Sequence, residues 1–312
     1  MPEDLPLKMT LFTSSNLIKT TLISLFYLLL SRVLVGFKSD QLVLIVIFNV
    51  CFYASWFTRK FILGFSIFIV YWILFDYMKA FPNYLYNSVS IEDLYNLEKI
   101  VFGINVNGVT LTPNEYWLAN SNTITDVCCG IFYLLWIPVP LAFAAYLFFF
   151  NRRQFLYFSF TFLLVNCLGF IVYYLYPAAP PWYVQQHGFE FFPLTPGNTG
   201  GLIRFDNFFN LPIFQSIYSK GSNVFAAMPS LHSSYPVIVV YYGLKNKLGL
   251  INIFFSIVML GIWFTAIYSS HHYMLDVLSG ILCAIIGIIF FNRLCKNKSV
   301  KVLLDKMTAG IS

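Results

Sequence analysis

Long apolar runs recur along this chain and restrict what it can fold into. Only 10% of the 312 residues are charged and 59% are hydrophobic, whereas soluble domains carry about 25% charged residues. A helix needs about 20 mostly apolar residues to cross the hydrocarbon core of a bilayer. We therefore predict an all-α polytopic membrane protein with about eight transmembrane helices, which excludes a soluble enzyme, a disordered chain and a nucleic-acid-binding protein. The candidate spans are residues 17–35, 42–57, 61–75, 127–150, 155–176, 230–244, 250–268 and 272–291.

The spacing of these runs predicts four parts. Residues 1–76 hold the N-terminal transmembrane helices and residues 77–126 form an outer loop. Residues 127–295 form the transmembrane domain that carries the candidate catalytic residues described below, and residues 296–312 form a basic cytoplasmic tail. A second long connection, residues 177–229, interrupts this domain. Both connections are far longer than ordinary loops, and connections of this length are usually functional.

Basic residues are concentrated on one side of the predicted membrane. With eight spans, both termini share a side with the connections that follow spans two, four and six. That side carries 13 of the 19 Lys and Arg residues. The positive-inside rule makes it cytoplasmic, so both long connections face outward. Its basic residues are Lys8, Lys19, Arg59, Lys60, Arg152, Arg153, Lys245, Lys247, Arg293, Lys296, Lys298, Lys301 and Lys306.

The remaining sequence signals bear on location and cofactors. The Asn-x-Ser/Thr acceptor at Asn297 falls on the cytoplasmic side, where it would not be glycosylated. We therefore expect a bacterial inner membrane with the site facing the periplasm; in a eukaryote the equivalent location is the Golgi lumen. The six cysteines show neither zinc-site nor disulfide-framework spacing, so we expect them to pack in the membrane. No cofactor and no metal are expected.

Three of the four histidines fall at the outward ends of two predicted spans. His232 follows a proline and then Ser230, and a serine cap beside a proline is typical of a helix start. The unpaired N–H groups of that first turn favour an anion. His271 and His272 open the last span, and Asp276 comes four residues after His272. On a helix such a pair shares one face, so the carboxylate can hold one imidazole nitrogen.

These residue types suit phosphoryl transfer through a covalent histidine. A neutral imidazole can attack phosphorus, an aspartate on its other nitrogen fixes the tautomer, and a second histidine can protonate the leaving alkoxide. His272, Asp276 and His232 are our candidates for these three roles. A metal site made of the same residues and His271 stays open as an alternative, because imidazole and carboxylate also bind metals.

A phosphate also requires binding groups. Arg204 and Lys220 are two of the few basic residues on the outward side, and an arginine can bind phosphate through two parallel hydrogen bonds. Together with Ser230 and His271 they form the predicted substrate-binding set. For the two basic residues, a role as ordinary loop charges stays open.

At these residues the chain resembles a known family. The blocks PSLH at 229–232 and HxxxD at 272–276 resemble the second and third signature motifs of the type 2 phosphatidic acid phosphatase superfamily. Upstream, YPAAPPWY at 176–183 and PGNTGGLIRFD at 196–206, followed later by HHY at 271–273, are similar to the catalytic subunit of fungal inositol phosphorylceramide synthase and its bacterial relatives.

The resemblance implies a lipid phosphotransferase. Phosphatidylinositol would donate inositol phosphate to the primary hydroxyl of ceramide, and diacylglycerol would leave. His272 would be the nucleophile and Asp276 its orienting partner. His232 would protonate the diacylglycerol oxygen and then activate ceramide. The resemblance also implies a six-helix catalytic bundle with extra N-terminal helices and a reaction without metal; no accessory subunit is expected.

The chain departs from the superfamily at two points. It contains no Arg-Pro dipeptide for the first motif, and Ala266 stands six residues before His272, where the phosphatases carry arginine. These absences argue against an ordinary phosphatase. Two other functions stay open: a hydrolase of the superfamily that acts on phosphatidate or a polyprenyl pyrophosphate, and a transporter or lipid scramblase whose histidines relay protons.

Overall fold

The chain forms two compact units in this computed structural model, which describes residues 11–219, 221 and 223–312. One unit comprises Met1–Ala80 and Asp305–Ser312, and the other comprises Phe81–Leu304. Helix α15 (Lys298–Ile311) occupies the segment predicted as a basic tail and includes residues of both units. The candidate residues that the structure describes all fall in the second unit.

The N-terminal unit is built from α1 (Ser14–Leu34), α2 (Ser39–Ala54), α3 (Trp56–Tyr77) and the short helix η1 (Met78–Ala80). Polar side chains join its helices: Thr20 bonds Tyr53 and Ser31 bonds Tyr77, each at 2.8 Å. Helix α3 begins earlier than the predicted 61–75, and its first turn includes Arg59. The guanidinium of Arg59 lies over the Phe52 ring and donates to the Phe52 carbonyl, so its charge is satisfied within the helix pair.

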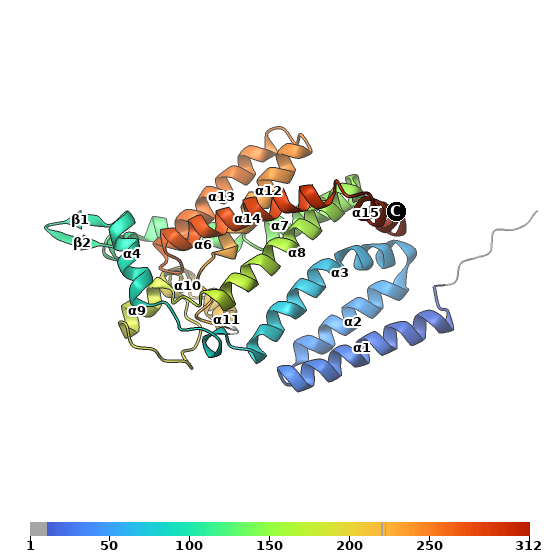
Figure 1. Ribbon diagram of the computed structural model, residues 1–312, viewed down its shortest axis with the longest axis horizontal. Coiled ribbons are helices and arrows are strands. Elements are labelled where there is room, and N and C mark those ends of the chain that lie inside the picture. Colours follow the sequence, from blue (N-terminus) through green and yellow to red (C-terminus); the bar gives the residue numbers. More distant parts are fainter. Residues whose placement is uncertain (1–10, 220, 222) are drawn as a thin grey trace, which may run out of the picture. The chain divides into compact units, whose positions relative to one another are not determined.

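Six helices make the bundle of the second unit. They are α6 (Thr123–Leu134), α7 (Pro138–Phe150), α8 (Arg152–Leu175), α12 (Leu231–Lys245), α13 (Ile251–Tyr268) and α14 (Met274–Leu294). Helix α12 packs against α8, α13 and α14, and Figure 1 shows these helices side by side. Helices α6 and α7 replace the single predicted span 127–150. The helix is interrupted before Pro138, the first residue of α7, because proline lacks the N–H that would continue the ladder.

The two long connections fold against each other as a cap over one end of the bundle (Figure 1). We define the cap as residues 81–122 and 177–229. Its first part holds η2 (Asn83–Leu85), α4 (Glu92–Phe102), strands β1 (Ile104–Val106) and β2 (Val109–Leu111), and α5 (Pro113–Ala119). Its second part holds α9 (Pro181–His187), η3 (Gly200–Leu202), α10 (Ile203–Phe209) and α11 (Ile213–Tyr218).

Backbone hydrogen bonds hold the two parts of the cap together. Ser90 N–H donates to the Pro177 carbonyl at 2.8 Å, and Ala179 N–H donates to the Ser90 carbonyl at 3.0 Å. Strands β1 and β2 pair antiparallel with Ile104 opposite Leu111. The turn between them is Asn107-Gly108, and both residues have positive φ, the conformation that a tight hairpin turn requires.

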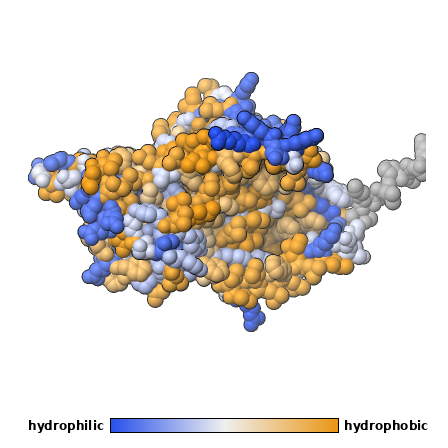
Figure 2. All heavy atoms as spheres, in the orientation of Figure 1, coloured by the Kyte–Doolittle hydropathy of each residue, from blue (hydrophilic) through white to orange (hydrophobic). Residues whose placement is uncertain are grey.

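The structure confirms the predicted all-α polytopic membrane fold. Six helical segments of the described chain are long and apolar enough to cross a membrane, with α6 and α7 together forming one of them. Helices α2 and α12, with 16 and 15 residues, occupy the two remaining predicted spans. In the second unit, hydrophobic residues cover the helices on the face shown in Figure 2, and hydrophilic residues gather at the end that carries α4 and the hairpin.

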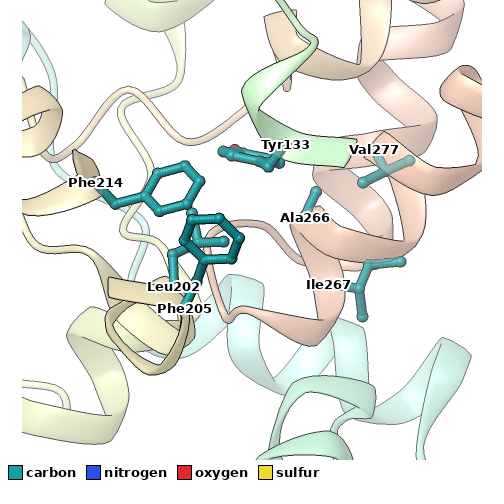
Figure 3. Packing of buried hydrophobic residues seen from close by; sticks show 7 residues of the cluster. All are labelled: Tyr133, Leu202, Phe205, Phe214, Ala266, Ile267 and Val277. Atoms are coloured by element: carbon teal, nitrogen blue, oxygen red, sulfur yellow. The ribbon is translucent and has the colours of Figure 1, made fainter. Parts of the chain in front are cut away.

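A buried apolar cluster lies where the cap meets the bundle. It combines Leu202, Phe205 and Phe214 of the cap with side chains of α6, α13 and α14 (Figure 3). The contributing bundle residues are Tyr133, Ala266, Ile267 and Val277. Tyr133 contacts His232, and Val277 follows Asp276 in the chain. The cluster therefore packs directly against the candidate catalytic residues described next.

Candidate active site

Close packing of α12 against α14 brings His232 near His271 and His272. Helix α12 begins at its cap residue Ser230, whose side chain accepts from the Ser233 N–H, as the sequence predicts. The backbone of Ser230 lies directly against Gly280 of α14, where an added methyl group would overlap the Ser230 carbonyl oxygen. The Ser230 N–H also donates to the Asp276 carbonyl at 2.9 Å. Glycine at position 280 therefore lets the start of α12 touch the first turns of α14.

The two candidate catalytic imidazoles are in direct contact. His232 Nδ1 lies 3.3 Å from His272 Nε2. The Tyr133 hydroxyl also lies 3.3 Å from the same Nδ1 atom, and the Trp136 ring stands edge-on to His232 with a centroid separation of 4.3 Å. His232 is thereby fixed by two aromatic side chains that the sequence pattern did not indicate.

Asp276 occupies the other side of His272. Its Oδ2 atom lies 3.5 Å from His272 Nδ1, and the carboxylate is fully buried. The same oxygen accepts the Tyr273 N–H at 2.9 Å. With the carboxylate facing Nδ1, we assign the imidazole proton to Nδ1, which leaves the Nε2 lone pair directed at His232.

The predicted start of the last span at His272 is wrong by two residues. Helix α14 begins at Met274, so His272 and Asp276 do not share a helical face. Instead, Tyr273 is the cap residue and Asp276 is the third residue of the helix, from which its side chain turns back toward His272. The pairing arises because an acidic side chain in the first turn reaches the residues that precede the helix.

Backbone hydrogen bonds fix the loop that carries both histidines, which we call the histidine loop (residues 269–273). The N–H groups of His271 and His272 both donate to the Ala266 carbonyl, at 3.0 and 2.9 Å. Ala266 itself is fully buried in the apolar cluster. An arginine here, as in the phosphatases, would place a charge among apolar side chains, so this fold has no room for that phosphate ligand.

Burial also sets the charge state of the nucleophile candidate. Only 6% of His272 is exposed, and this burial lowers the pKa of His272 to about 4. Burial likewise holds the pKa of His271 well below its usual range. At neutral pH both imidazoles are therefore neutral, and His272 keeps the lone pair that a nucleophile needs.

The predicted substrate-binding residues take different places. His271 is buried beside His232 and His272. Its Nδ1 lies 3.0 Å from the Ser269 hydroxyl, and its Nε2 is buried and without a hydrogen-bond partner in the described chain. Arg204 donates to Asp126 at 2.6 Å, while one of its terminal nitrogens is buried and has no hydrogen-bond partner among the described residues. The Ser230 side chain serves as the helix cap. Lys220 lies outside the described residues.

Sequence reasoning missed two polar residues of the cap that contact the histidine loop and α14. The Asn114 amide donates to the carbonyls of Ile267 and His272, at 2.7 and 2.9 Å. The Glu98 carboxylate accepts the N–H groups of Met274 and Leu275. One signal pointed to Glu98: it shares the buried face of an amphipathic helix with Leu94, an unusual place for an acid.

The arrangement can perform one type of chemistry directly. A neutral imidazole has a carboxylate oxygen 3.5 Å from its Nδ1, and its Nε2 faces a second imidazole that can carry a proton. Such an arrangement can supply the nucleophile, the orienting group and the acid–base partner of covalent catalysis. Among the residues described, no cluster of three or more His, Cys, Asp or Glu side chains has the arrangement of a metal site.

The chain is similar in sequence to several known proteins. Over 283 residues the chain is 46% identical to the phosphoinositol dihydroceramide synthase of Bacteroides thetaiotaomicron, an alignment that covers 90% of this chain and 93% of the relative. It is 27% identical to the inositol phosphorylceramide synthase of Candida albicans, covering 83% of this chain and 54% of the relative. Identity to the catalytic subunit of the Schizosaccharomyces pombe synthase is also 27%, covering 73% of this chain and 53% of the relative.

The chain thus spans about half the length of these fungal relatives. No solved structure matches it significantly. Residues 103–290 match the sequence model of the PAP2 superfamily, a region that contains the histidine pair, Asp276 and most of the cap. With this match and the bacterial relative together, the chain belongs to the PAP2 superfamily of helical membrane proteins.

Proposed function

We propose that this protein transfers inositol phosphate from phosphatidylinositol to the primary hydroxyl of ceramide or dihydroceramide and releases diacylglycerol. The observation that carries the substrate assignment is the 46% identity, over nearly the whole chain, to a phosphoinositol dihydroceramide synthase. The contact between His232 and His272, with Asp276 behind it, supports the chemistry.

In the first half-reaction, His272 Nε2 attacks the donor phosphorus. A nitrogen–phosphorus bond forms while the bond from phosphorus to the diacylglycerol oxygen breaks. Asp276, on Nδ1, stabilises the positive charge that develops on the ring. His232, held as imidazolium by the phosphodiester anion, gives its proton to the departing oxygen. The phosphate takes the place of the direct contact between the two imidazoles.

In the second half-reaction, His232 acts in the opposite direction. Now neutral, it removes the proton from the ceramide hydroxyl, whose oxygen attacks the phosphorus held by His272. The nitrogen–phosphorus bond breaks, His272 returns as a neutral imidazole, and His232 is again protonated. One histidine thus serves both leaving group and acceptor, as microscopic reversibility requires.

Two buried nitrogens are suited to hold the polar part of the donor. His271 Nε2 and one terminal nitrogen of Arg204 are buried and without a hydrogen-bond partner in the described chain. Buried donors of this kind cost free energy until they are satisfied, and an anionic phosphate or an inositol hydroxyl would satisfy them. Lys220 stays a prediction for the same role, and Ser230 contributes through the helix start that it caps.

The proposed location follows from the basic residues along the chain. The positive-inside rule assigns the termini to the cytoplasm and the cap with the histidine pair to the opposite side. We propose a bacterial inner membrane with the site facing the periplasm.

The proposal is tested with purified protein in lipid micelles, given phosphatidylinositol and a labelled short-chain ceramide. We expect labelled inositol phosphorylceramide with the wild type and none with His272→Ala. Release of diacylglycerol at one rate with and without ceramide would instead show a hydrolase. A protein that turns over no phosphatidylinositol would contradict the proposed donor, and phosphatidylglycerol and phosphatidylethanolamine would then be tried.

A further inference from the structure

Glu98 lies in the cap, yet both of its carboxylate oxygens are bonded to the start of α14. Oε1 accepts the Met274 N–H at 2.9 Å and Oε2 accepts the Leu275 N–H at 3.1 Å. These are the first two residues of the helix, whose N–H groups have no partner within the helix itself. Glu98 is fully buried and belongs to α4. It precedes Met274 by 176 residues in the chain.

A second cap residue holds the preceding turn. The Asn114 amide bridges the carbonyls of Ile267 and His272, and Asn114 is also fully buried. The backbone on both sides of Tyr273 is therefore bonded to buried side chains of the cap. The cap thus fixes the segment from which the nucleophile candidate and its carboxylate partner project.

The division of hydrogen bonds between Glu98 and Asp276 explains why a second acid is needed. Asp276 is the third residue of α14, from which a carboxylate ordinarily bonds the free N–H groups of the first turn. Among the described residues, its Oδ2 accepts the Tyr273 N–H and its Oδ1 has no hydrogen-bond partner, while Glu98 satisfies Met274 and Leu275. Without Glu98, those two N–H groups would compete with His272 for the Asp276 carboxylate.

We propose that Glu98 is a positioning residue for the transfer reaction: by capping α14 it leaves Asp276 free to orient His272. This inference rests on the proposed function of the histidine pair. Glu98 touches neither substrate nor reacting atom, so its effect appears in the rate of turnover rather than in the binding of donor.

The ionisation of Glu98 offers an independent readout. Burial, reinforced by the nearby Asp276 carboxylate, raises the pKa of Glu98 to about 7, although the two backbone N–H groups oppose the shift. Glu98 also interacts with the Tyr273 side chain. The other titratable groups around that side chain are Asp276, Tyr95 and Glu115. Because burial keeps the pKa of His272 at about 4, the nucleophile does not titrate where Glu98 does.

The sign of the pH effect separates positioning from folding. The pKa of Glu98 is higher in the folded chain than its ordinary 4.5, so the folded state binds this proton more tightly. This group therefore favours the folded state more as pH falls from about 7 toward 4.5. Protonation removes one acceptor from the cap of α14, so we expect kcat to fall on the acid side of about pH 7 while the protein stays folded.

The test compares Glu98→Gln with Glu92→Gln, an exposed acid on the same helix. Because glutamine offers one acceptor oxygen in place of two, we expect Glu98→Gln to lower kcat about 10- to 100-fold, the range of a misplaced catalytic group. The KM for phosphatidylinositol should change by less than about twofold, since the ground-state contacts are kept. The control should match the wild type, and the acid-side fall near pH 7 should be absent from Glu98→Gln.

Each outcome decides the proposal. A Glu98→Gln variant with kcat near that of the wild type would overturn the proposal. A loss of activity that merely matches the loss of folded protein would also overturn it, because each folded molecule would then be fully active. If the variant does not accumulate, the wild-type profile decides, because a kcat that is flat between about pH 8 and 6 contradicts the proposed cap. The proposed function is tested separately, by identifying the product that the wild type makes. The test of Glu98 needs only the ratio of variant kcat to wild-type kcat, which is measured with whichever donor lipid the wild type turns over.

Discussion

Gly280→Ala tests whether the spacing of α12 and α14 sets the rate. The added methyl carbon would lie 3.0 Å from the Ser230 carbonyl carbon and would overlap its oxygen. Carbon atoms normally pack about 3.5–4.0 Å apart, so the two backbones must separate by about 0.5–1 Å. His232 follows Ser230 by two residues, and its 3.3 Å contact with His272 would open by a similar amount.

A misplacement of about 1 Å at a reacting group can cost about 100-fold in rate, so we expect kcat to fall roughly 10- to 100-fold. Overpacking costs about 1–3 kcal/mol of stability, offset in part by about 1 kcal/mol from the better helix propensity of alanine. The variant should therefore stay folded. The assay is the rate of labelled inositol phosphorylceramide formation at saturating phosphatidylinositol, with thermal unfolding followed by circular dichroism.

Gly287→Ala is the matched control. Position 287 is also a buried glycine of α14, but an added methyl group would meet the Val165 side chain of α8 rather than a backbone. That side chain can move without displacing α12, so we expect the control to keep kcat within about threefold of the wild type. A fully active Gly280→Ala variant would refute the link between helix spacing and the histidine contact.

Four further results are expected. Asp276→Asn should lower kcat by about 10²–10⁴ without unfolding the protein, because it removes the orienting charge; steady-state kinetics and circular dichroism check both parts. Tyr133→Phe deletes the hydroxyl beside His232 and should lower kcat by less than about tenfold, so a loss as large as that of Asp276→Asn would make the hydroxyl a catalytic group. Ala266→Arg buries a charge in the apolar cluster and should cost about 3–5 kcal/mol, visible as a lower unfolding temperature. A chelator should leave the initial rate unchanged, since imidazoles and a carboxylate supply all the proposed steps; a collapse that zinc restores would favour a metal site.

Much of the fold follows from local sequence patterns. Each predicted span contains a helix because a run of apolar residues in lipid must satisfy its own backbone hydrogen bonds. The break before Pro138 and the true start of α14 were missed, since hydropathy averages over many residues whereas a helix end depends on one or two. Tyr273 is not a usual cap residue, so its role could not be read from the sequence.

The candidate site was predictable only where its residues are chemically unusual. His232, His272 and Asp276 are ionisable groups in an apolar chain, and such groups are expected to be functional. Tyr133 and Trp136 are two aromatics among many, so nothing local distinguishes them. Local patterns also do not show long-range contacts: the Asn114 and Glu98 bonds join segments 158 and 176 residues apart.

The covalent intermediate is the most direct test of the central claim. Purified protein is mixed with phosphatidylinositol labelled in its phosphate, without ceramide, and quenched in alkali within one turnover. The account predicts labelled protein in which the label is stable to alkali, is lost in acid, maps to His272 and disappears in His272→Ala. Labelled protein should pass its label to ceramide in a chase. Formation of inositol phosphorylceramide at the full rate without any labelled protein would contradict the account.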